Sequence, residues 1–157
     1  VAEVFDYLQE GQAVACVQHD YTPHAMIKMD GLQNPPYPRK NWSSLMVFNC
    51  EHPSTQKLTL ETVNTQTPAW LHRMTWAKDE EIGSIPVTYN HLVGYYDEEK
   101  PKVVHYTDGG PWHPGYEKVQ FGELWRYFMS QYEQDKVQAE IEKYWQDHPE
   151  LKRYTKC

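Results

Sequence analysis

The peptide HYTDGGPW, from His105 to Trp112, combines residue types that can bind a metal and an anion. His105 lies at the end of the apolar run VVHY, and Gly109 and Gly110 follow it in a turn. An imidazole at a strand terminus can ligate a metal, and the exposed N–H groups of a glycine turn can meet an anion. A metal-bridged diphosphate fits this pattern. A histidine that is only hydrogen-bonded within a β-turn fits it too, and spacing alone leaves both interpretations open.

A second polar stretch, YPRKNWSS from Tyr37 to Ser44, precedes a buried run. It holds two cations, an amide, an indole and two hydroxyls, including Lys40, Trp42, Ser43 and Ser44. This mixture suits phosphate and sugar recognition, with the Trp42 ring able to stack on a pyranose face. The alternative is a solvated basic turn beside a core tryptophan.

Two further groups of polar residues carry weaker signals. Asp79 and Glu80 belong to an acidic run that could bind an acceptor hydroxyl or serve as a base, although such a run more often caps or solvates a helix end. HDYTPH holds His19 and His24, but no second pair of ligands follows at a zinc-site spacing. We interpret it as a loop with substrate contacts.

Three apolar runs predict the strands that position these residues: Ala13–Val17, Ser43–Cys50 and Val103–Tyr106. Between these runs there are segments whose apolar residues recur at helical spacing. A Pro- and Asn-rich stretch at 18–41 predicts a long ordered loop that offers a binding surface. Strands that alternate with helices indicate an α/β fold, whose ligands gather at the carboxyl ends of the strands. Here those ends are Asp20, Asn49 and Tyr106.

Helices are expected at both ends of the chain. A short one opens the sequence at VAEVFDYL, where Val4, Phe5 and Leu8 share a face. Near the other end, three- and four-residue steps predict one or two amphipathic helices through Phe121, Leu124, Phe128, Val137, Ile141 and Tyr144.

Composition excludes several classes of protein. The chain has 157 residues, of which 39% are hydrophobic, so we expect one folded domain rather than a disordered tail. Its net charge of −7 argues against nucleic acid as a partner. Three widely spaced cysteines indicate reduced thiols, and no apolar run approaches the roughly 20 residues that cross a bilayer. These features predict a cytoplasmic protein without a transmembrane segment.

Four segments, in order, resemble the later part of a GT-A glycosyltransferase, a family that includes glycogenin and the lipopolysaccharide galactosyltransferases. VAEVFDYL resembles the helix after the Asp-x-Asp strand, and NWSSLMVFNC resembles the Asn-Ser-Gly-Val strand. IPVTYNHLVG resembles the Leu-Pro-x-x-Trp-Asn segment, and PKVVHYTDGGPW resembles the terminal His-x-x-Gly-x-x-Lys-Pro-Trp signature. The resemblance implies a partial GT-A, Rossmann-like fold: a mixed sheet with flanking helices and a C-terminal helical segment. It assigns 1–157 to a single domain, with a family-like core at 1–116 and C-terminal helices at 117–157.

The resemblance also implies a reaction, the transfer of a sugar from a nucleotide-sugar donor to a saccharide or other hydroxyl acceptor. It gives His105 a role as ligand of a divalent metal, Mn²⁺ in that family, whereas Asp79 and Glu80 are the catalytic candidates by their residue types alone. Donor and sugar binding fall to Lys40, Trp42, Ser43, Ser44, Asn90, Gly109, Gly110 and Trp112. A bound cation would neutralise the charge that grows on the departing diphosphate.

The sequence departs from the family pattern at three positions. Asp108 stands where the first glycine would be, and Trp42 stands where the family has Asn. No lysine precedes Pro111 and Trp112, so Lys40 or Arg39 would have to take its place.

The Asp-x-Asp motif itself is absent, so we expect this chain to be a fragment that is inactive alone and self-associates through surface exposed by truncation. A non-catalytic carbohydrate-binding module and a structural or assembly domain with an aromatic surface are the alternatives.

Overall fold

The computed structural model describes residues 2–28, 31–97 and 100–149, and residues 150–157 of the expected C-terminal segment lie outside this range. The chain falls into two compact units, Val1–Gly109 and Gly110–Cys157. The first is mixed α/β and the second is helical, so the chain is an α/β protein with a small mixed sheet and a C-terminal helix.

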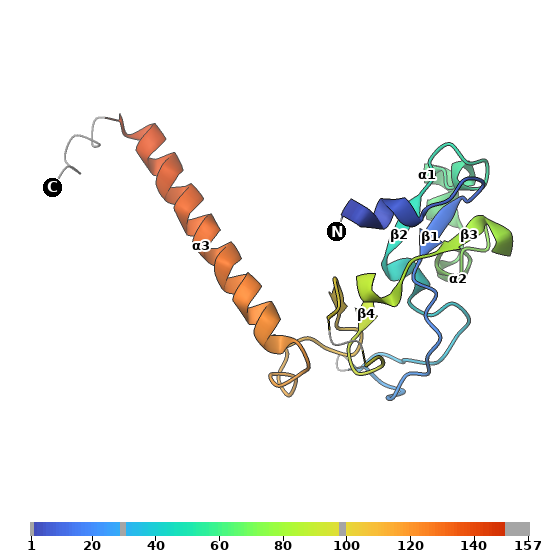
Figure 1. The fold of residues 1–157 in the computed structure, drawn as a ribbon, viewed down its shortest axis with the longest axis horizontal. Coiled ribbons are helices and arrows are strands. Elements are labelled where there is room, and N and C mark those ends of the chain that lie inside the picture. The colour runs from blue at the N-terminus through green and yellow to red at the C-terminus, as the bar shows by residue number, and fades with distance from the viewer. Residues whose placement is uncertain (1, 29–30, 98–99, 150–157) are drawn as a thin grey trace. The chain divides into compact units, whose positions relative to one another are not determined.

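A three-stranded sheet forms the centre of the first unit, in the order β2-β1-β3 (Figure 1). Strand β1 (Val14–Cys16) pairs antiparallel with β2 (Met46–Phe48) and parallel with β3 (Ile82–Ser84). All three residues of β1 are fully buried. This burial on both faces is what the continuous apolar run predicted.

Alternate residues of β1 serve two hydrophobic clusters, because successive side chains point to opposite faces of a sheet. On one face Ala15 and its neighbour Val17 pack with residues of η1 (Ala2–Tyr7), β2 and the segment after β3. On the other face Val14 and Cys16 pack with the segment that follows α2. The buried members are Val4, Ala15, Val17, Val47, Ile85 and Tyr89 in the first cluster, and Ala13, Val14, Cys16, Met74, Trp76 and Ile82 in the second.

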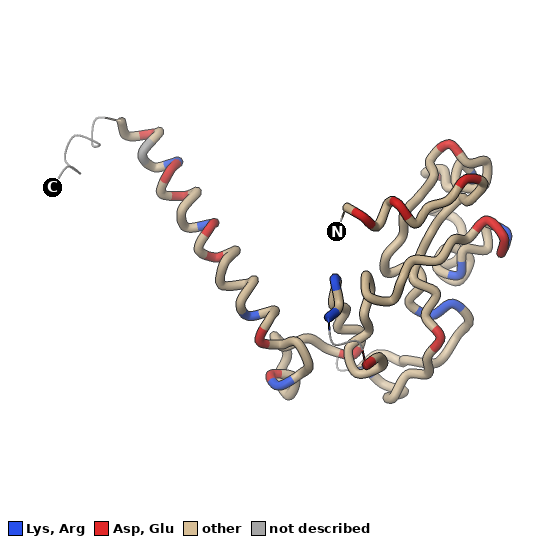
Figure 2. Tube along the Cα trace, viewed as in Figure 1, with Lys and Arg blue, Asp and Glu red and all other residues tan. Residues whose placement is uncertain are grey.

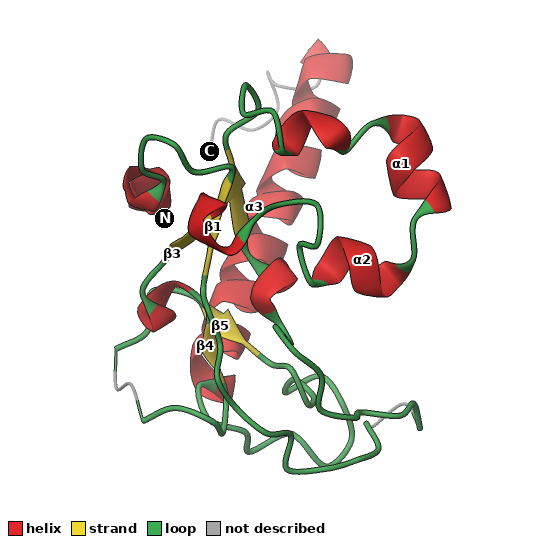
Figure 3. Cartoon of the chain, turned by 90° about the vertical axis from the view of Figure 1, so that its right-hand side faces the viewer, coloured by secondary structure: helices red, strands yellow, loops and turns green. Residues whose placement is uncertain are grey.

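Two very short parallel strands form a separate sheet: β4 (His91–Leu92) and β5 (Val104–His105). The two strands lie side by side (Figure 3). Leu92 lies opposite His105, so the end of β5 is fixed to the strand that follows Asn90. The predicted strand at Val103–Tyr106 is therefore present, but it pairs with β4 and not with the central sheet.

One prediction about the strand ends is wrong. Because β2 runs antiparallel to β1, Asn49 lies beside the start of β1, where its backbone N–H donates to the carbonyl of Ala13 at 2.9 Å. The opposite end of β2 is the one that reaches the carboxyl end of β1. There the expected strand Ser43–Cys50 is shortened by the 3₁₀ helix η2 (Trp42–Ser44).

Short helices join the strands, each with a local reason for its start. In α1 (Leu60–Thr65) the side chain of Thr59 accepts from the N–H of Thr62, and in α2 (Pro68–His72) that of Thr67 accepts from Trp70. The remaining turns are the 3₁₀ helices η3 (Thr55–Lys57), η4 (Asp79–Glu81) and η5 (Val87–Tyr89). Described residues of the predicted loop 18–41 form no helix or strand, apart from one isolated bridge between Ile27 and Gln33, which confirms the loop.

The second unit consists mainly of one helix, α3 (Gly122–Asp147). Acidic and basic residues are interspersed along it (Figure 2). Its apolar side chains are spread around the helix rather than gathered on one stripe, so the amphipathic pattern expected from the spacing is weak. In the part of the chain that the structure describes, no helix is both long and apolar enough to cross a membrane.

Candidate functional site

Side chains from four separate segments meet just beyond the carboxyl end of β1. His19 follows that strand, Ser44 ends η2, Asn90 follows η5, and His105 ends β5. The antiparallel course of β2 brings Ser44 to this position, and the pairing of β4 with β5 brings His105 next to Asn90. We call these four residues the Asn90 network.

The carboxamide of Asn90 links the other three residues. Its Nδ2 donates to Ser44 Oγ at 2.7 Å and lies 3.1 Å from His19 Nε2. Its Oδ1 lies 3.0 Å from His105 Nδ1. Asn90 and His19 are buried, His105 is half-buried and Ser44 is exposed, so the network runs from the interior to the surface.

Burial favours the neutral form of both imidazoles. It lowers the pKa of His19 to about 4, with a smaller contribution from the charge of His105. It also lowers the pKa of His105, and the positive charge of Lys28 acts in the same direction. A neutral imidazole keeps one nitrogen lone pair, which is the form that ligates a metal.

Hydrogen bonds and ring contacts join loop 18–41 to residues near the network. The Asn41 amide donates to Tyr21 OH at 2.6 Å and to Thr107 Oγ1 at 2.8 Å, and the Trp42 indole donates to the carbonyl of His19 at 2.9 Å. Tyr95 adds to these contacts: its hydroxyl donates to Asp108 at 2.6 Å, and its ring stacks on His24 with centroids 4.2 Å apart. The loop is therefore tied to the strand ends.

The two cations that were expected to replace the missing lysine are already engaged. Lys40 is buried, donates to the carbonyl of Pro35 at 3.0 Å and lies over the Tyr37 ring. Arg39 donates to the carbonyl of Arg73 at 2.7 Å and to the Asp79 carboxylate at 2.5 Å. These side chains stabilise the turn before η2.

The structure does not bring the remaining predicted residues into the Asn90 network. Asp79 pairs with Arg39 at the surface, and Glu80 lies 3.9 Å from the ammonium of Lys78. The Ser43 hydroxyl lies 2.8 Å from His72 Nδ1.

The glycine turn divides between the two units. Gly109 ends the first unit, whereas Gly110 and Trp112 belong to the second. The Trp112 ring covers Gly110 so closely that a Cβ built there would lie 2.2 Å from ring carbons. The glycine is thus required for this local fold, whatever else it does.

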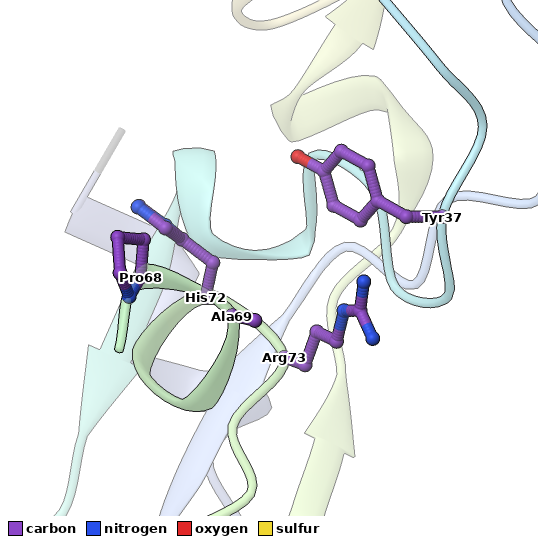
Figure 4. Close-up of a pocket in the computed structure, with 5 residues that line it drawn as sticks. All are labelled: Tyr37, Pro68, Ala69, His72 and Arg73. Carbon is purple, nitrogen blue, oxygen red and sulfur yellow. The ribbon is translucent and has the colours of Figure 1, made fainter. Parts of the chain in front are cut away.

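A pocket of about 260 Å³ lies beside η2 and α2. Tyr37, Pro68, Ala69, His72 and Arg73 line it, with the ring of Tyr37 and the guanidinium of Arg73 close to each other (Figure 4). Its mainly apolar wall with one cation could admit a small ligand that has an apolar body and a polar or anionic end.

Sequence reasoning found three members of the Asn90 network but did not assign His19 to it, nor did it single out Tyr21, Lys28 and Tyr95. The aromatic and histidine content of loop 18–41 was a signal for the loop as a whole. Nothing in the spacing pairs its residues with Tyr95, which lies more than 50 positions away in the chain.

Comparison with known proteins gives a match to one curated plant protein. No family model matches the chain, and no solved structure matches it. The chain is 46% identical over 141 residues to Protein CDI of Arabidopsis thaliana, an alignment that covers 86% of this chain and 54% of that protein. The chain thus spans about half the length of this curated relative.

Proposed function

We propose that the chain is part of a nucleotide-sugar glycosyltransferase of the GT-A type, which transfers a sugar from a nucleotide-sugar to a saccharide or other hydroxyl acceptor. One observation carries the proposal. Ser44, Asn90 and His105 come from the three segments that resemble successive family motifs, and they share one hydrogen-bonded network at the end of β1. A shared site is what such motifs require, whereas a chance resemblance would leave them scattered.

A divalent metal, Mn²⁺ by resemblance, belongs to this proposal. His105 fits the role of ligand because its Nδ1 is held by Asn90, which leaves Nε2 for a metal. Across the described residues 2–28, 31–97 and 100–149, no three His, Cys, Asp or Glu side chains gather to hold a metal. The described part of the chain therefore does not complete a metal site by itself. A bound metal would neutralise charge on the leaving diphosphate.

Lys28 is the best candidate for the cation that contacts the diphosphate. Arg39 and Lys40 are engaged elsewhere, while the charge of Lys28 reaches both His105 and Lys40, as its effect on their pKa values indicates. Half-buried Trp42, held by its bond to His19, is the candidate for contact with the sugar.

The reaction is best tested on the whole relative. Full-length Arabidopsis Protein CDI, incubated with a panel of nucleotide-sugars and Mn²⁺, is expected to release nucleotide from at least one donor, and chelation should stop the release. No release from any donor, with or without an acceptor panel, would contradict the proposal.

The metal role is tested on the present chain. In NMR spectra, Mn²⁺ alone should broaden the ring signals of His105 well before those of His52, a histidine outside the Asn90 network. Sugar binding that survives His105→Ala and ignores Mn²⁺ would favour a carbohydrate-binding module. A melting temperature that responds to neither metal nor nucleotide-sugar would favour an assembly domain.

A further inference from the structure

We infer that Asn90 is a positioning residue that sets the tautomers of both His19 and His105, so that His105 alone presents a nitrogen lone pair to a ligand. This inference rests on the proposed function for its purpose, since a metal or phosphate-bearing ligand is what His105 would meet. The hydrogen bonds that carry it are independent of that function.

The argument starts from the two ends of the Asn90 carboxamide. Oδ1 can only accept a hydrogen bond, so His105 Nδ1, at 3.0 Å, must carry the hydrogen. In a neutral ring the lone pair then lies on Nε2. His105 therefore has one nitrogen committed to Asn90 and one left to ligate.

The amide nitrogen of Asn90 requires His19 to accept a hydrogen bond, whereas His105 donates one to the amide oxygen. Nδ2 can only donate, and its two hydrogens have two acceptors, Ser44 Oγ at 2.7 Å and His19 Nε2 at 3.1 Å. His19 must then carry its hydrogen on Nδ1, which lies 2.9 Å from Tyr96 OH. Both nitrogens of His19 are occupied within the protein.

Ser44 fixes which way the carboxamide faces. Its hydroxyl donates to the carbonyl of Asn41 at 2.6 Å, so its oxygen is left to accept from Asn90. A flipped amide would place Oδ1 against an acceptor and lose this bond. The short η2 helix thus determines, through one amide, which histidine can bind a ligand.

The inference changes the role of Asn90. The family resemblance suggested a contact with the sugar, but every polar hydrogen of its side chain is used inside the protein and its oxygen holds His105. Asn90 is also buried. It acts on a ligand through His105.

Long-range ¹H–¹⁵N NMR of the imidazoles, on the full chain without metal, tests this directly. At pH 8, above the ordinary imidazole pKa of about 6.5, neutral rings report their tautomer through the two nitrogen shifts. Loss of a signal set in His19→Gln and in His105→Gln identifies the two rings. We expect Nδ1–H for both, whereas exposed histidines of this chain should show mainly Nε2–H, the form that prevails in water.

Substitutions of Asn90 test the roles of its amide oxygen and its amide nitrogen separately. Asn90→Asp keeps an acceptor for His105 and places a second acceptor against His19 Nε2, so His105 should remain Nδ1–H while His19 should shift toward Nε2–H. Asn90→Leu should release both rings toward Nε2–H. Ser43→Ala is the matched control, because the Ser43 hydroxyl contacts His72 and no member of the Asn90 network, and both tautomers should be unchanged. If Asn90→Leu does not fold, the Asn90→Asp variant and the control still test whether Asn90 sets the two tautomers.

An Nε2–H tautomer of His105 in the unsubstituted chain would overturn the inference, and so would an Nδ1–H tautomer that persists in folded Asn90→Leu. Neither result would bear on nucleotide release by the full-length relative. Conversely, Nδ1–H rings together with a relative that releases no nucleotide would support the positioning role of Asn90 and refute the transferase.

Discussion

At the scale of single residues, Lys28 has the clearest electrostatic effect on the site. Its charge lowers the pKa of His105, in addition to the larger effect of burial. Lys28→Met should therefore raise the pKa of His105 while leaving it below the ordinary value, since burial remains. A ¹H NMR titration of the His105 ring measures this. Lys78→Met, which removes an exposed cation outside the network, should leave the titration unchanged, and equal effects of the two substitutions would refute the assignment.

The sequence predicted individual site residues better than their relations. His105 was found because an imidazole stands at a strand end before two glycines, and Ser44 and Asn90 were found within motif-like segments. The bonds from Asn90 to Ser44 and to His19 join residues 46 and 71 positions apart, and such distances leave no trace in local spacing. That is why His19 was not grouped with them and why Asn90 was assigned to the sugar.

At the scale of elements, the segment after β3 couples the core to the site. The backbone N–H of Ile85 donates to the carbonyl of Cys16 at 2.9 Å, and its buried side chain packs in the cluster that includes Val4 and Tyr89. This segment leads directly into η5 and Asn90.

Ile85→Ala should lower the free energy of unfolding by about 2–5 kcal/mol, because it leaves a cavity in the core. Urea denaturation measures the loss. Leu60→Ala, at a position that is 82% exposed, is the control and should change stability by no more than about 0.5 kcal/mol. A similar loss for both would show that the core does not lie where this fold has it.

Apolar runs predicted three of the five strands that the described residues form, and the two that were missed have a physical explanation. Strand β3 contains Gly83 and Ser84, which break the apolar pattern. A Cβ at Gly83 would lie 2.2 Å from the side-chain oxygen of Gln12, so a larger residue there would require the Gln12 side chain to move. Strand β4 has only two residues, so it has no period to detect. The antiparallel direction of β2, on which the site depends, likewise comes from tertiary packing and not from a local signal.

At the scale of the whole first unit, a surface group ties the N-terminal η1 helix to the segment before β5. The Glu3 carboxylate accepts from Lys102 and from the Tyr89 hydroxyl, which lies 2.7 Å away. These hydrogen bonds, Lys102 first, lower the pKa of Glu3 to about 2.

Stability should follow that shift with pH. The folded-state pKa lies below the ordinary value of 4.5, so the contribution of Glu3 is present above pH 4.5 and is lost as the pH falls toward 2. Urea denaturation of the chain and of Glu3→Gln should thus differ at pH 6 and converge near pH 2. High salt should narrow the difference at pH 6, because the pair is exposed. A constant difference across this range would contradict the assignment.

The pairing of β1 has a consequence for the order in which the protein is made. Its antiparallel neighbour begins at Met46 and its parallel neighbour at Ile82, and the last member of the Asn90 network is His105. Contacts between residues so distant in sequence form slowly, since the intervening chain must first be closed into loops. On the ribosome the central sheet can therefore be completed only after Ser84 has emerged, and the Asn90 network only after His105 has emerged.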